Sequence, residues 1–177
     1  MAGNSDELHW RETYFILFPH DRRPTLAQVA GAITEANGRY RIENRSADDG
    51  GMLESLLVES MEDHAAVEIS YEVGDAVIEQ NLAWAKEFES QLSAEKLQSI
   101  ILSDARLDLA HYERLPASSA DTPMDLGAFG DDFAGPCNED EDAFNMLDPT
   151  CILTVVDALE GLTGGLTFDP AAGEIIT

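Results

Sequence analysis

The tetrapeptide His20–Arg23, HDRR, places an imidazole, a carboxylate and two guanidinium groups between two prolines. Histidine exchanges protons near neutral pH, and arginines beside a helix N-terminus can bind an anion. The tetrapeptide follows a predicted strand and precedes a predicted helix, a position that often carries function in open α/β sheets. His20, Asp21, Arg22 and Arg23 therefore form a candidate pocket for a small ligand. The alternative is that both arginines only neutralise nearby carboxylates.

A second candidate is the acidic stretch Gly130–Phe144, GDDFAGPCNEDEDAF, which contains six carboxylates and no basic residue. Its candidate interaction residues are Asp131, Asp132, Glu139, Asp140, Glu141 and Asp142. An EF-hand calcium loop needs alternating oxygen ligands and a central glycine in register, and the stretch has neither. We expect no cofactor and no specific metal site, and at most weak binding of divalent cations. The stretch is then either a contact surface for a basic protein or a solvated loop.

Motifs of catalysis and nucleotide binding are missing from the sequence. It contains no G-x-S-x-G, no P-loop, no G-x-G-x-x-G and no H-E-x-x-H, and no two histidines are three to five residues apart. Cys137 lies among carboxylates, which raise the pKa of a thiol and make it less reactive. Cys151 begins an apolar segment and is expected in the core. These observations favour a non-enzymatic protein over an enzyme.

The charge is strongly negative and unevenly distributed. Ten Lys and Arg face 35 Asp and Glu, which gives a net charge of −25, and residues 115–177 contain 13 acidic and no basic residues. Such a field repels nucleic acid and anionic membranes and favours a basic protein as partner. We expect protein–protein interaction with a basic partner. An alternative in the same class is an immunity or inhibitor-type protein whose carboxylates replace the phosphates of a nucleic acid.

The first residues, MAGNSDELHW, lack the basic and apolar regions of a signal peptide. Apolar runs are far shorter than the ~20 residues that a membrane span requires. Neither cysteine belongs to a C-x-x-C pair. We therefore expect a cytoplasmic protein with reduced thiols.

The elements that would position these residues follow from periodicity. Continuous or alternating apolar residues predict strands at 10–18, 39–46, 52–60, 66–74 and 106–115, and helical spacing predicts helices at 25–37, 75–92 and 93–105. Thr25 is expected to cap the first helix, and Asn37-Gly38 to end it in a left-handed conformation. The first strand begins polar and becomes a continuous aromatic and aliphatic run up to Phe18, which is typical of a strand covered on both faces.

The resulting order β-α-β-β-β-α-α-β predicts an α+β fold, a mostly antiparallel sheet with helices packed on one face. We divide the chain into a flexible N-terminal tail (1–9), an α+β core domain (10–114) and an acidic Pro/Gly/Asp-rich loop or linker (115–147). The remainder, 148–177, is expected to form a helix ended by Gly161 or Gly164-Gly165, then a short hairpin, both docked on the core.

Overall fold

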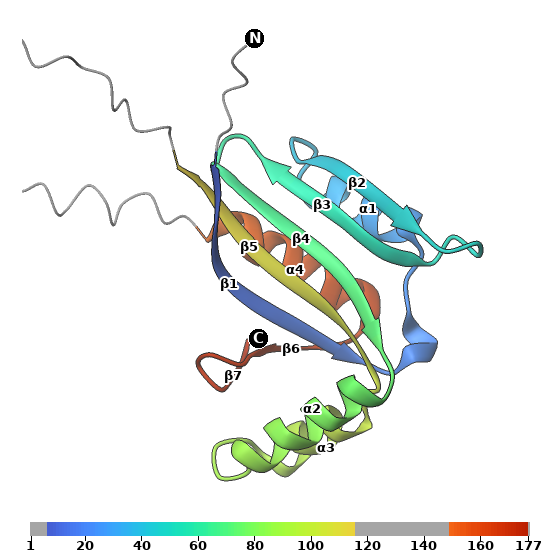
Figure 1. Cartoon of the computed structure of the whole chain (residues 1–177), viewed down its shortest axis with the longest axis vertical. Coiled ribbons are helices and arrows are strands. Elements are labelled where there is room, and N and C mark those ends of the chain that lie inside the picture. The colour runs from blue at the N-terminus through green and yellow to red at the C-terminus, as the bar shows by residue number, and fades with distance from the viewer. Residues whose placement is uncertain (1–6, 116–148, 177) are drawn as a thin grey trace, which may run out of the picture.

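The computed structural model describes residues 7–115 and 149–176, which form one antiparallel sheet flanked by helices (Figure 1). Its strands are β1 (Glu7–Phe18), β2 (Arg41–Ala47), β3 (Leu53–Ser60), β4 (Ala65–Val73), β5 (Ala105–Leu115), β6 (Leu166–Asp169) and β7 (Glu174–Ile176). They lie in the order β2-β3-β4-β5-β1-β6-β7. The predicted α+β class is confirmed, with a C-terminal helix and hairpin after the acidic stretch.

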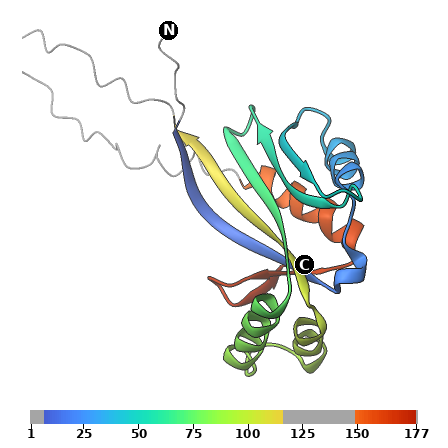
Figure 2. The same cartoon turned by 45° about the vertical axis from the view of Figure 1, so that its right-hand side comes forward.

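The helices of the described residues are the short 3-10 turn η1 (His20–Arg22) and α1 (Leu26–Ala36), α2 (Asp75–Glu87), α3 (Ala94–Leu102) and α4 (Thr150–Thr163). Among them, none has both the length and the apolar character needed to cross a membrane. Helices α1 and α4 lie side by side on one face of the sheet, whereas α2 and α3 form a separate pair beyond the ends of β4 and β5 (Figures 1 and 2).

The C-terminal part of strand β1 has apolar side chains on both faces and contributes to two hydrophobic clusters. Ile16 and Phe18 point into the cluster beneath α1 and α4, and the alternate residues Phe15 and Leu17 point into a second cluster on the opposite face. All four are buried. The period of two residues thus explains how one uninterrupted apolar run serves two cores.

The larger cluster lies between the sheet and the α1–α4 layer. It joins the inward residues of β3, β4 and β5 to the apolar stripe of α4, including Ile69, Leu107, Leu109 and Ile152, which are fully buried. Cys151 is also fully buried there, as expected, and burial raises the pKa of its thiol to about 12. This cluster is the main source of hydrophobic stabilisation.

The smaller cluster is aromatic and joins α2–α3 to the C-terminal hairpin. The ring of Trp84 lies 5.0 Å from those of Phe15 and Phe168, and Phe88 lies 5.5 Å from Phe168. Gly173, with φ of +67°, leaves room for Phe88, because a Cβ at that position would lie 2.4 Å from its ring. The C-terminal hairpin is therefore packed against the helix pair and also paired with β1 through β6.

The opposite face of β3, β4 and β5 is open over most of its length, because the helices on that side among the described residues, α2 and α3, lie only at its end (Figure 2). Its outward residues are mostly polar, such as Glu68, Ser70 and Glu72 of β4. We call this the open face. The contrast with the apolar residues between them produces the alternation along the middle of β4.

Several boundaries differ from the sequence predictions. Strand β1 begins at Glu7, inside the predicted tail, because it pairs with β5 as far as Leu115. Helix α1 ends as predicted, but Asn37 is extended (φ −152°) and not left-handed, since the chain turns directly into β2. Helix α2 ends at Glu87 rather than at residue 92.

Candidate functional site

The HDRR corner forms a single helical turn between β1 and α1. The amide of Arg22 donates to the carbonyl of Pro19 at 2.9 Å, and that of Arg23 donates to the carbonyl of His20 at 3.1 Å. Helix α1 then begins with the predicted cap, in which Thr25 and Gln28 bond each other's backbone amides. The corner is thus held between a strand end and a capped helix start, and its side chains are directed outward.

His20 ties the corner to the junction between α3 and β5. Its backbone amide donates to Asp104 Oδ1 at 2.7 Å, and its Nδ1 lies 2.6 Å from Asp104 Oδ2. Burial alone would raise the pKa of Asp104, but these hydrogen bonds from His20 outweigh it and the pKa is lowered. His20 therefore serves as a clamp between two segments far apart in sequence.

Arg23 is committed to the structure. Its Nε and Nη2 donate to the carbonyl of Leu53 at 3.1 and 2.7 Å, and its Nη1 donates to Asp48 Oδ2 at 3.0 Å. The guanidinium carbon also lies 4.2 Å from the centre of the Tyr71 ring. Arg23 joins η1 to the β2–β3 turn, which leaves little of its hydrogen-bonding capacity for a ligand.

Arg22 is exposed and differs from its neighbour in its contacts. Its Nη1 lies 3.5 Å from the carbonyl oxygen of Gly164, at the limit of a hydrogen bond. Gly164 ends α4 in the left-handed conformation (φ +62°), as the sequence predicted, so α4 presents its carbonyl end to Arg22. Within the described residues no carboxylate pairs with Arg22, although acidic residues outnumber basic ones by more than three to one.

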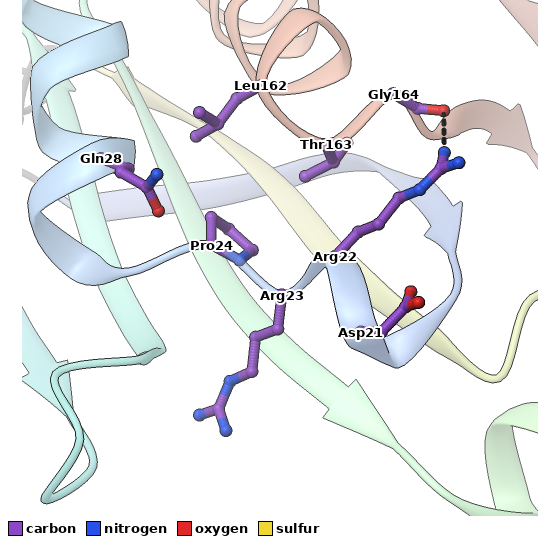
Figure 3. A pocket seen from close by; sticks show the side chains of 8 residues that line it. All are labelled: Asp21, Arg22, Arg23, Pro24, Gln28, Leu162, Thr163 and Gly164. Atoms are coloured by element: carbon purple, nitrogen blue, oxygen red, sulfur yellow. Dashed lines mark hydrogen bonds between the residues drawn. The ribbon is translucent and has the colours of Figure 1, made fainter.

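A hollow of about 460 Å³ opens at this corner (Figure 3). It is lined by Asp21, Arg22, Arg23, Pro24, Gln28, Leu162, Thr163 and Gly164. In Figure 3 the side chain of Arg22 reaches across to Gly164, whereas that of Arg23 points away from Leu162 and Thr163. The hollow therefore offers one available guanidinium, one amide and one carboxylate beside a small apolar wall.

The structure brings together three of the four predicted pocket residues. Asp21, Arg22 and Arg23 line the hollow, and His20 does not, because it is bonded to Asp104. The predicted interaction residues Asp131, Asp132, Glu139, Asp140, Glu141 and Asp142 lie outside the described residues. The sequence did not reveal that Leu162, Thr163 and Gly164 form the other wall of the hollow. The Gly164-Gly165 pair indicated where α4 ends, but not that this end lies next to Arg22.

A buried histidine, His111, pairs with a glutamate on the helix-covered face. His111 of β5 is 7% exposed, and its Nδ1 lies 3.1 Å from Glu12 Oε1 of β1. Next to it, Arg11 pairs with the buried Glu113 at 3.1 Å. These contacts fasten β1 to β5, which is a structural role.

Within residues 7–115 and 149–176, no group of three or more His, Cys, Asp or Glu side chains is arranged to hold a metal ion. No known protein family, no curated protein and no solved structure matches this chain. The functional argument therefore rests on charge and geometry.

Proposed function

We propose that this protein acts by binding a basic partner protein through its acidic surface, without catalysis. The observation that supports the proposal is that half of the basic side chains form ion pairs within the chain. Arg11, Arg23, Arg39, Arg106 and Arg114, half of all Lys and Arg, pair with carboxylates of the same chain. Internal pairing neutralises these cations and leaves a large excess of carboxylates facing solvent.

The excess is spread over the described surface. Exposed acidic residues outside these pairs include Glu35, Glu43, Asp49, Glu68, Glu72, Asp75, Glu79, Glu87, Glu89, Glu95, Asp157 and Glu174. None of them is paired with a cation among the described residues. A field of this sign speeds encounter with a basic surface and orients it, over a range of about 8 Å at physiological salt.

The test is capture of partners from native lysate on the immobilised full chain, followed by elution from about 50 to about 300 mM salt. We expect basic proteins to elute across this range. A first variant replaces Asp131, Asp132, Glu139, Asp140, Glu141 and Asp142 by their amides and should lose most of the bound material. If nothing elutes in the gradient, the proposal is wrong.

A control variant tests whether partner binding depends on a particular acidic surface or only on the net charge of the protein. It replaces Glu35, Asp75, Glu79, Glu87, Glu89 and Glu95 by their amides, so that the net charge changes by the same amount at exposed positions in helices and, for Glu89, in the turn after α2. We expect this variant to retain its partners. Equal losses in both variants would mean that only the overall charge matters, without a defined docking surface.

Mimicry of nucleic-acid charge, as in an immunity or inhibitor-type protein, is a special case of this proposal. It requires carboxylates held at fixed spacing along a rigid face. The residues chosen for it lie outside the described part of the chain, so it stays a prediction. Competition decides it: a basic nucleic-acid-binding partner should be displaced by duplex DNA or RNA, and any other partner should not.

A second candidate function is binding of a small anionic ligand at the HDRR corner. It is favoured by the 460 Å³ hollow and by the exposed Arg22, which has only a long contact to the Gly164 carbonyl. A carboxylate or phosphate group would form charge-assisted hydrogen bonds with that guanidinium and would replace only the long contact to Gly164. His20, bonded to Asp104, would support the corner and would not touch the ligand.

Thermal unfolding with a panel of small carboxylates and phosphates tests this candidate. A ligand at a hundred times its dissociation constant adds about 2.7 kcal/mol to the free energy of unfolding. Arg22→Gln should abolish the shift, while Arg41→Gln, which alters another exposed arginine away from the hollow, should not. The candidate is abandoned if no compound shifts the melting temperature.

We place the protein in the cytoplasm as part of the proposal. Cys151 supports this, because it is a free thiol buried in the core, the state that a reducing compartment maintains. Fractionation of cells expressing the tagged chain checks the location.

A further inference from the structure

The open face carries a second hollow, of about 190 Å³, near the first residues of β1. Leu8 of β1, Asn44 of β2, Ser55 and Leu57 of β3, Glu68 of β4 and Tyr112 of β5 line it. Strand register explains why space is left. Across the β4–β5 pair, Glu68 lies opposite Ala110, and Tyr112 lies opposite Ala66, so each large side chain faces a methyl group.

The walls of this hollow are partly apolar, and the one charged residue that lines it is negative. Leu8, Leu57 and the ring of Tyr112 supply the apolar surface. The Glu68 side chain is exposed, and it accepts a long hydrogen bond of 3.4 Å from the Tyr112 hydroxyl. No cation of the described residues pairs with Glu68. Burial and the charge of Glu68 both raise the pKa of Tyr112, so the phenol stays a neutral donor.

An exposed aromatic side chain lies next to Tyr112 on the same face of the sheet. Trp10 lies directly opposite Tyr112 in the β1–β5 pair and therefore on the same face, and it is 61% exposed. Its indole nitrogen donates to Thr13 at 3.0 Å, which fixes the ring. Exposed, oriented tryptophans beside apolar hollows are enriched at the energetic centres of protein interfaces.

We propose that this hollow receives a lysine side chain of the basic partner, with Trp10 covered by the partner's surface. The inference rests on the proposed function and deepens it. The stem of lysine has four carbons, which would pack along Leu8 and Leu57, and its ammonium would reach Glu68 and the Tyr112 ring. The volume corresponds to roughly six water molecules, enough for that side chain.

Other side chains fit less well on physical grounds. An acidic side chain would be repelled by Glu68. A purely apolar one would remove water from a carboxylate without pairing it, which is costly. Arginine also pairs with carboxylates and stacks on aromatic rings, so the experiment compares it directly with lysine.

The experiment titrates the full-length, isotope-labelled protein with capped trilysine and follows backbone amides by NMR. Nζ-acetylated trilysine, which keeps the stem and removes the charge, serves as the ligand control, and capped triarginine as the comparator. We expect trilysine to shift the amides of Ser55, Leu57, Glu68 and Tyr112 most. Acetylated trilysine should shift them little.

Glu68→Gln should weaken trilysine binding about threefold to fivefold, the loss expected for one partly exposed ion pair. The matched control is Glu72→Gln, on the same strand and face but outside the hollow, which should leave the affinity unchanged. Trp10→Ala should weaken capture of the basic partner without changing trilysine affinity. Unchanged amide spectra away from each substitution establish that the variants fold.

The outcomes separate the two proposals. If trilysine binds but shifts amides elsewhere, and Glu68→Gln equals Glu72→Gln, the hollow is not the site and the acidic surface remains a partner surface. If trilysine causes no shifts at about 50 mM salt, both proposals are overturned. If triarginine binds more tightly than trilysine through Glu68, the assignment of lysine is wrong.

Discussion

The two faces of the sheet differ in polarity and burial: one packs against helices and the other faces solvent. Under α1 and α4, alternate residues of β4 and β5 are apolar, and Ile69, Leu107 and Leu109 are fully buried. On the open face, the residues between them are mostly polar, such as Glu68, Ser70 and Glu72. The same strands therefore provide stability on one side and, as we propose, a binding surface on the other, and the predictions below test that division.

The largest effect is expected from a cavity on the covered face. Ile69→Ala should lower the free energy of unfolding by about 2–5 kcal/mol, because Ile69 is fully buried in the main cluster. The neighbouring Ser70→Ala, which points to the open face, should change it by less than about 0.5 kcal/mol. Urea unfolding of both variants gives the comparison; similar losses would show that the open face is also part of the core.

Two glycines near the end of α4 provide a second contrast. A Cβ at Gly165 would lie 2.6 Å from Ile16 Cγ2 and 2.9 Å from the Leu17 carbonyl, so Gly165→Ala should cost about 1–3 kcal/mol. Gly161 lies within α4 with no atom within 4 Å of such a Cβ. Gly161→Ala should stabilise by about 0.5–1 kcal/mol in the same urea experiment. A loss at both positions would contradict the geometry of this junction.

The neighbouring arginines of the HDRR corner should behave differently. Arg23→Gln removes donors from Leu53 and Asp48 and should cost about 1–3 kcal/mol of unfolding free energy. Arg22→Gln should cost less than about 0.5 kcal/mol, because it loses only the long bond to Gly164. Thermal and urea unfolding measure both. Equal costs would mean that Arg22 is structural and unavailable to a ligand.

The smallest effect concerns pH and the His20 clamp. The folded-state pKa of Asp104 lies below its ordinary value of 3.8, because the hydrogen bonds from His20 outweigh the effect of burial. A lowered pKa contributes stability above pH ~3.8 that is lost as pH falls through the folded value. Asp104→Asn should therefore be less stable than the wild type at pH 5, and the difference should shrink towards pH 3. A constant difference would rule out this linkage.

The sequence predicted the fold well where one periodicity dominated. Strand β4 alternates, β1 is apolar on both faces, and Thr25 caps α1; each of these local signals survives in the structure. It predicted ends less well, because tertiary pairing decides them, as when β5 draws β1 back to Glu7.

The candidate sites show the same limit. The HDRR motif indicated a corner, but only the fold brings Gly164 to Arg22 and Asp104 to His20, across 142 and 84 positions of the chain. The hollow at Glu68 depends on small residues of two paired strands, Ala66 of β4 and Ala110 of β5, and their register is not visible in the sequence.

The position of β1 between β5 and β6 affects how the protein is made. The first strand emerges from the ribosome long before either neighbour, and β6 begins about 150 residues after β1 ends. At roughly 5–20 residues per second, about 7–30 s pass before β6 is synthesised and can pair with β1. During synthesis the nascent chain thus exposes an apolar strand. We expect a chaperone at the ribosome exit to bind this strand until its neighbours are made.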